Sequence, residues 1–260
     1  DNRRFLEKQP SGYYLDLAHL LMPHVDGSKS TDSIGLLVRS SYCQSVEYLL
    51  SVLVASMQSP GCVIGWLLSY RTSELREMVD WLRQGKPIPS CAGGGGAKGW
   101  EGFWGTVFAS MNINRGESNT SDSISVDDVV GMYAGYCEKI GREYLDDSFQ
   151  REHVSHKHGL RLIPGGKEVH IKPGGVASDG DWHLLAGSEH GAEFAYLDQL
   201  GKTKNYVIRS KSVSYELAPM IERMQMNAIV VELIRSWVAA KCGYGSRGFA
   251  VSVVCDKNIF

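Results

Sequence analysis

The stretch DSFQREHVSHKHGLRLIPGG, Asp147 to Gly166, marks a change in the chain from helical to strand-like periodicity. In the residues before it, apolar side chains recur every three or four positions, the spacing of one face of an α-helix. In the residues after it, short alternating runs are separated by Gly-Gly, Pro-Gly and Asp-Gly pairs, which are typical of turns between strands. Lys157 and His158 suit a helix C-terminus, and Gly159 suits the residue that follows it. The stretch therefore predicts that a helix ends near His158 and a sheet begins.

The helix that leads into this stretch is predicted to be long. Ser125 and Asp128 form a plausible capping box at its start, and its apolar stripe is centred on Ile140. Continued as one helix at 100° per residue, it places Arg151 and His158 on the inward face and the two other histidines of the stretch on the solvent side. Upstream, the same periodicity predicts four further helical segments, at 15–22, 31–55, 63–82 and 100–111.

Downstream, five short runs within 160–209 predict strands. A helical pattern returns over 215–242, and one more strand is expected near the end of the chain. These elements predict a mostly α fold: a helical bundle with an inserted small antiparallel β-sheet, α+β overall. We expect a single domain over 1–260, with the bundle at 30–158, the sheet insertion at 160–210 and a closing helix of the bundle at 213–243.

The composition is that of an ordinary globular protein, with 43% hydrophobic and 22% charged residues. The net charge of −2 provides no general basic field, so any contact with nucleic acid needs a local basic patch. The six cysteines form no CxxC pair, which favours reduced thiols and a cytoplasmic protein, and no membrane span is expected. The run GGGGAKG, 93–99, lacks the Ser or Thr that a phosphate-binding P-loop has after its lysine, so we expect a flexible loop.

Three interpretations compete for the histidine-rich stretch. A capped helix end explains Lys157 and His158, but it does not explain an inward-facing arginine. A zinc site would use His153, His156 and His158, yet these do not converge from one helix and no HExxH motif is present. We therefore expect no metal and no cofactor. The third interpretation is catalytic and pairs Arg151 with a histidine.

Arg151 stands four residues before His156, with the spacing Arg-x4-His, and six before His158, with the spacing Arg-x6-His. Here the chain resembles the HEPN superfamily, whose members are small helical bundles, often homodimers, and many of them metal-independent ribonucleases with an Arg-x4-6-His motif. The segment YRTSELREMVDWL, 70–82, is similar to a core helix of such bundles. The resemblance implies an RNA-acting enzyme, toxin-like or in defence, that works as a homodimer. It implies that Arg151 holds the phosphate and that His158, or His156, transfers the proton.

Two questions stay open: the environment of a second charged cluster, and whether the chain is catalytic. Arg71 and Glu74, together with Glu77, are expected either as an ionic cluster facing the bundle interior or as a solvated helix face. Arg71, Glu74 and Lys157 are the predicted ligand-binding residues. The chain as a whole is either such a ribonuclease or a non-catalytic helical-bundle module that binds a ligand, RNA or a partner. The carboxylate of Glu152, directly after the arginine, favours the second.

Overall fold

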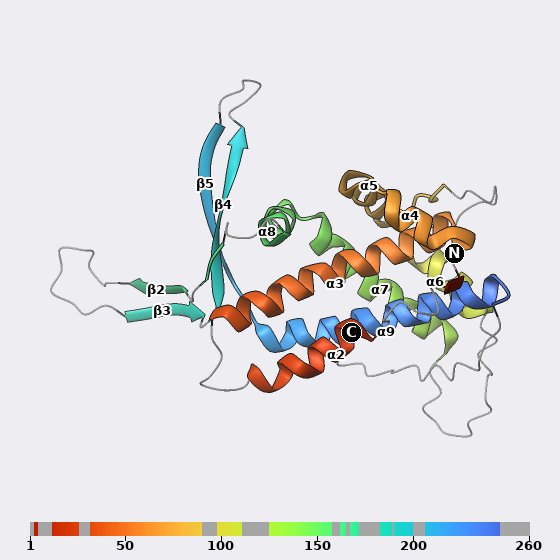
Figure 1. The fold of residues 1–260 in the computed structure, drawn as a ribbon, viewed down its shortest axis with the longest axis horizontal. Coiled ribbons are helices and arrows are strands. Elements are labelled where there is room, and N and C mark those ends of the chain that lie inside the picture. Colours follow the sequence, from red (N-terminus) through yellow and green to blue (C-terminus); the bar gives the residue numbers. More distant parts are fainter. Residues whose placement is uncertain are drawn as a thin grey trace. The chain divides into compact units, whose positions relative to one another are not determined.

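The structure is a computed structural model and describes residues 3–4, 12–25, 32–89, 98–110, 125–157, 162–164, 167–171, 183–188, 190–199 and 206–244. Over these residues the chain is mostly helical and carries two small antiparallel sheets (Figure 1). The predicted fold class, a helical bundle with a small β insertion, is confirmed. The strand expected near the C-terminus lies outside the described residues.

The chain divides into two compact units. Unit 1 comprises Asp1–Leu15, Ser45–Asp146 and Met226–Phe260, and unit 2 comprises Asp16–Gln44 and Asp147–Gln225. Helix α2 (Tyr13–Leu21) and the long helices α3 (Asp32–Gln58) and α9 (Leu217–Lys241) each contain residues of both units. These three helices confirm the segments expected at 15–22, 31–55 and 215–242. The expected subdivision into a bundle, an insertion and a closing helix stays a prediction.

In unit 1, the single helix expected over 63–82 is wrong, because the structure has two helices there. These are α4 (Val63–Ser69) and α5 (Thr72–Arg83). Tyr70 and Arg71 between them have extended backbones, with ψ angles of 151° and 152°. The carboxylate of Glu74 accepts the backbone N–H of Arg71 at 2.8 Å, which starts the second helix.

The long helix expected to run from Ser125 to about His158 also breaks in two. Helix α7 (Val126–Leu145) ends at Asp146, whose ψ of 127° is extended, and α8 (Asp147–Lys157) begins directly after it. The predicted capping box is confirmed, since Ser125 Oγ accepts the N–H of Asp128 at 3.0 Å. Because α8 is a separate helix, the angular count along α7 cannot be continued into it.

The core of unit 1 is aromatic and is built where α5, α6 (Gly99–Ser110) and α7 pack against one another. The ring of Trp104 lies 4.9 Å from that of Tyr133, measured between centroids. A buried polar chain joins three helices of this unit: Tyr136 on α7 donates to the Asn227 side chain on α9 at 2.8 Å, and Asn227 donates to Ser45 on α3 at 2.9 Å. Buried polar groups that are satisfied in this way specify one packing arrangement.

In unit 2, each of the five predicted runs contains a strand, listed in chain order as β1 (Leu162–Pro164), β2 (Lys167–Ile171), β3 (His183–Ser188), β4 (Gly191–Gln199) and β5 (Tyr206–Ser214). They form two antiparallel sheets rather than one, with the orders β1-β4-β5 and β2-β3. β4 and β5 make a long hairpin (Figure 1), and α8 packs against β4. In this hairpin Tyr196 pairs with Arg209, and Phe194 pairs with Lys211.

None of the described helices, taken singly, is both long and apolar enough to cross a bilayer. The segments Asp32–Gln58 and Pro60–Ser69, which are joined at a sharp bend, are together long and apolar enough to do so, by length and composition alone.

Candidate functional site

The predicted site in unit 2 is organised around Glu152, a carboxylate that is 1% exposed on α8. Arg39 on α3 donates to both of its oxygens, from Nε at 2.9 Å and from Nη2 at 2.8 Å. The hydroxyl of Tyr215 donates to it at 2.9 Å. The rings of Tyr42, Phe149 and Tyr215 each lie within 5.5 Å of the Arg39 guanidinium, measured to the ring centroid. The ion pair is therefore bidentate, buried and enclosed by aromatic side chains.

These contacts decide the ionisation state of Glu152. Burial by itself would raise the pKa of the carboxyl, because a charge is poorly solvated in the interior. Hydrogen bonds from Arg39 and Tyr215, with the positive charge of Arg39 and the neighbouring His156, outweigh burial and lower the pKa to about 2. The same environment raises the pKa of Tyr215, first through burial and then through the charge of Glu152. Glu152 is therefore ionised at neutral pH, and the positive charge of Arg39 compensates its negative charge.

Arg151, the neighbouring residue, points in a different direction from the one predicted. It is exposed, not inward-facing, and its guanidinium lies 4.3 Å from the ring centroid of Tyr196 on β4. Within the described part of the chain, the guanidinium makes no hydrogen bond. Stacking on tyrosine therefore fixes Arg151 while its N–H donors remain available.

The strand β5 adds two more cations beside Arg151. Arg209 stands directly opposite Tyr196, and Lys211 is two residues further along, so both side chains project from the same face of the hairpin as Tyr196. Lys211 donates from Nζ to Ser148, which is one helical turn before Arg151 on α8. We call Arg151, Tyr196, Arg209 and Lys211 the basic face of unit 2. Its three cations are all exposed.

The predicted histidines are not brought to this face. The side chain of His156 is 4% exposed, and its Nε2 lies 3.6 Å from Glu152. His153 is buried, with its ring 6.1 Å from that of Phe149. Their expected position on the solvent side is wrong, because α8 is a separate helix and the apolar stripe of α7 does not predict its buried face. His158 lies outside the described residues. No group of three or more potential metal ligands occurs among the residues that the structure describes.

The predicted ligand-binding residues belong to both units: Arg71 and Glu74 to unit 1, and Lys157 to unit 2. Arg71 and Glu74 are exposed at the start of α5, where the backbone N–H of Arg71 donates the capping hydrogen bond to the Glu74 carboxylate. Glu77 is also exposed, so the solvated helix face is correct and the inward-facing cluster is wrong. Lys157 is exposed at the last position of α8. The structure therefore joins Arg71 to Glu74.

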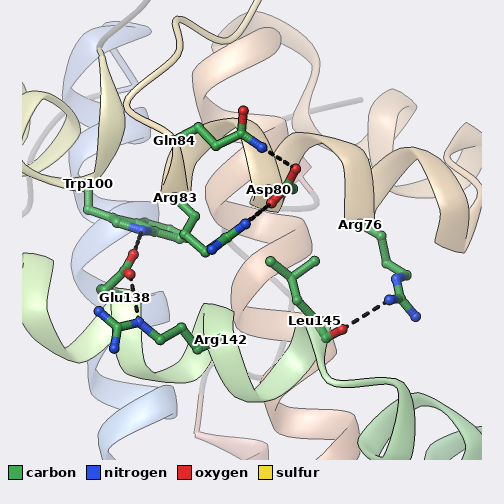
Figure 2. Close-up of polar contacts among 8 residues, drawn as sticks. All are labelled: Arg76, Asp80, Arg83, Gln84, Trp100, Glu138, Arg142 and Leu145. Atoms are coloured by element: carbon green, nitrogen blue, oxygen red, sulfur yellow. Dashed lines mark hydrogen bonds and ion pairs between the residues drawn. The ribbon is translucent and has the colours of Figure 1, made fainter.

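Unit 1 contains a second polar site, which the sequence did not predict. A cleft of about 520 Å³ between α5 and α7 is lined by Arg76, Arg83 and Arg142 and by the carboxylates of Glu77, Asp80 and Asp146. Figure 2 shows two of the arginines directed at carboxylates: Arg83 at Asp80, and Arg142 at Glu138. The third, Arg76, donates to the carbonyl of Leu145 at 3.0 Å, at the end of α7.

Sequence reasoning missed Arg39 and Tyr196 in unit 2 and the arginines of this cleft in unit 1. Arg39 had a usable signal, because it follows Val38 and precedes Tyr42 by three positions on a helix whose neighbours are apolar. A charge at such a position needs a buried partner of opposite sign. Tyr196 had none, since Arg151 comes from a segment distant in sequence. The pairs Asp80–Arg83 and Glu138–Arg142 do have helical spacing, but no local pattern shows that they meet in one cleft.

Comparisons with known proteins do not extend the assignment: no protein-family model, curated protein or solved structure matches the chain.

Proposed function

We propose that the chain acts on RNA and that the basic face of unit 2 binds the RNA backbone. The observation that carries this proposal is the exposed Arg151, fixed over Tyr196 with its N–H donors available. Guanidinium groups bind phosphate oxygens with paired hydrogen bonds, and aromatic rings among cations are typical of surfaces that bind single strands. The face concentrates positive charge on a chain whose net charge is −2.

The carboxylate next to Arg151 does not oppose this function. A free carboxylate at position 152 would repel phosphate, which was the main argument for a non-catalytic module. Glu152 is buried, however, and its charge is compensated by Arg39 at 2.8 Å. The repulsion on the outer surface of α8 is correspondingly small.

Metal-independent cleavage is the further step that the HEPN resemblance implies. The 2′-oxygen would lose a proton and attack the phosphorus, the bond to the 5′-oxygen would break, and that oxygen would gain a proton. His158 is the histidine we assign to proton transfer, because His156 is directed at Glu152. A homodimer would supply a second His158, so that one histidine accepts a proton while the other donates one.

The alternative is an RNA-binding module without cleavage, and the burial of His156 favours it. Both candidate functions use the basic face, so the same set of variants tests both of them. Cleavage of the bound RNA distinguishes one from the other. The first measurement is the affinity for a mixed-sequence single-stranded RNA in excess EDTA, with cleavage followed on the same samples. We expect Arg151→Ala to weaken binding by about tenfold and to reduce the salt dependence by roughly 0.7 in log–log slope.

Arg83→Ala, an exposed arginine of unit 1, is the matched control and should bind RNA like the wild type. If wild-type protein does not retain RNA at low salt, or if Arg151→Ala binds as well as wild type, the proposal is wrong. Cleavage that is lost in His158→Ala while binding persists identifies the ribonuclease. Bound RNA that stays intact with the wild type identifies the binding module.

A further inference from the structure

We propose that the cleft between α5 and α7 of unit 1 binds a small ligand that carries a phosphate group. This site is separate from the basic face and does not depend on the proposed action on RNA. Its volume of about 520 Å³ lies in the range of small-molecule sites. Its polar lining comes from two helices that pack directly against each other, so the side chains start from a fixed scaffold.

Two arginines of the cleft are held by carboxylates that are themselves held by a second donor. Glu138 accepts Arg142 Nε on one oxygen at 2.8 Å and the indole N–H of Trp100 on the other at 2.6 Å. Asp80 accepts Arg83 on one oxygen and the Gln84 side chain on the other. Figure 2 shows both arrangements. Each carboxylate is thereby fixed in position and orients its arginine.

This arrangement leaves one end of each guanidinium available. Arg142 uses only Nε, and Arg83 uses Nε and Nη2. Both Nη groups of Arg142 and Nη1 of Arg83 make no hydrogen bond to any part of the chain that the structure describes. The two side chains are 71% and 46% exposed, so a ligand can reach them. Paired N–H donors of this kind match the oxygens of a phosphate group.

The charge of the cleft selects a small ligand over a polyanion. Three arginines and three carboxylates line it, so its formal charges cancel and its long-range attraction for RNA is weak. Recognition must come from directional hydrogen bonds at short range. A second cleft of about 390 Å³ also contains Arg83 and is lined by Lys98 and by Gly131 and Gly135 of α7. It provides room for the organic part of a phosphorylated molecule. The glycine run that precedes Lys98 lies outside the described residues and is not part of the site.

The test is isothermal titration calorimetry of the full chain with adenosine monophosphate, adenosine and inorganic phosphate. We expect adenosine monophosphate to bind at least about tenfold more tightly than adenosine, because only the phosphate reaches the arginines. We expect Arg142→Ala and Arg83→Ala each to weaken binding by about tenfold. Inorganic phosphate that binds as tightly as the nucleotide identifies free phosphate as the ligand, whereas weaker binding identifies a phosphorylated organic molecule.

Arg151→Ala is the matched control and should leave nucleotide binding unchanged, just as Arg142→Ala should leave RNA binding unchanged. The two proposals can therefore fail separately. The cleft proposal is overturned if adenosine and its monophosphate bind equally, if neither nucleotide nor phosphate binds, or if both cleft variants keep wild-type affinity. Circular dichroism of each variant verifies that the fold is intact.

Discussion

Two neighbouring residues of α8, Arg151 and Glu152, have opposite roles. Glu152 is directed inward and binds Arg39, whereas Arg151 is directed outward over Tyr196. A buried ion pair contributes little net stability by itself, because desolvation of the two charges offsets their attraction. Removal of one partner is costly, because the other charge then stays buried without compensation. The pair therefore fixes how α8 is oriented more than it raises stability.

At this scale we predict that Glu152→Ala lowers the free energy of unfolding by about 3–5 kcal/mol, because the Arg39 guanidinium loses its carboxylate. Urea unfolding at neutral pH, followed by circular dichroism, measures the loss. Glu216→Ala removes an exposed carboxylate and should change the value by less than about 0.5 kcal/mol. The double variant Arg39→Met/Glu152→Leu should recover most of the loss. A loss below about 1 kcal/mol for Glu152→Ala would contradict this account of the pair.

The residue types of the site could be predicted from the sequence, but whether each side chain is buried or exposed could not. Arg151 was singled out by its Arg-x4-His and Arg-x6-His spacings and by its predicted inward-facing position. Its predicted inward direction came from continuing the angular count of α7 through Asp146. The contact of Arg151 with Tyr196 brings together two elements separated by a long stretch of chain, and no local pattern encodes such a distance. The exposed position of the arginine follows from tertiary packing alone.

At the scale of elements, most helices and all five strands of unit 2 follow from periodicity, whereas the two helix breaks do not. Neither the break at Tyr70–Arg71 nor the break at Asp146 contains Pro or Gly, the usual helix-ending residues. The signals present were those of new helix starts: Thr72 and Glu74 at one break, Asp146 and Ser148 at the other. At the first break apolar residues continue at nearly helical spacing, from Leu68 to Leu75, which hides it from a periodicity count. At the second, Phe149 would lie about 180° from Ile140 on a continuous helix, so the apolar stripe does not continue.

Helix α7 contains glycines in two different environments, and this gives a prediction about packing. A Cβ added at Gly141 would lie 2.9 Å from a ring carbon of Trp100, whose indole is held by Glu138. A Cβ added at Gly131 meets nothing within 4 Å. We expect Gly141→Ala to lower the free energy of unfolding by about 1–3 kcal/mol through overpacking. Gly131→Ala should raise it by up to about 1 kcal/mol through helix propensity.

Thermal and urea unfolding of the two glycine variants make this comparison within one helix. If both substitutions stabilise the protein equally, the indole of Trp100 can move away from α7. In that case the orientation of Glu138 by Trp100, and with it that of Arg142, is weaker than the contacts indicate.

At the scale of the whole molecule, each unit contains the residues of one of the two proposed binding surfaces. The basic face uses residues of unit 2, and the arginine cleft uses residues of unit 1. The chain thus combines a face with an excess of positive charge and a cleft whose charges cancel. We expect added salt to weaken binding at the face far more than binding at the cleft.

Acid unfolding of the whole chain gives a prediction with a defined sign. The pKa of Glu152 falls from its ordinary value of 4.5 to about 2 in the folded protein. A lowered pKa contributes stability that is fully present above pH 4.5 and is lost as the pH falls toward 2. The difference corresponds to roughly 3 kcal/mol. Urea unfolding between pH 7 and pH 2 should show this component in the wild type, and Glu152→Gln should lack it. An equal pH dependence in the two proteins would assign acid sensitivity to other carboxylates.

The placement of the cysteines has a consequence for how the two units can be followed in solution. Cys43 in unit 2 and Cys137 in unit 1 are both fully buried, and burial raises the pKa of Cys137 to about 12. A thiol in this state does not react with alkylating reagents until the surrounding structure opens. Among the cysteines that the structure describes, these two are the fully buried ones, and each unit contains one of them. The labelling rates of these two cysteines, measured site by site by mass spectrometry, report the opening of the structure around each of them without any engineered probe.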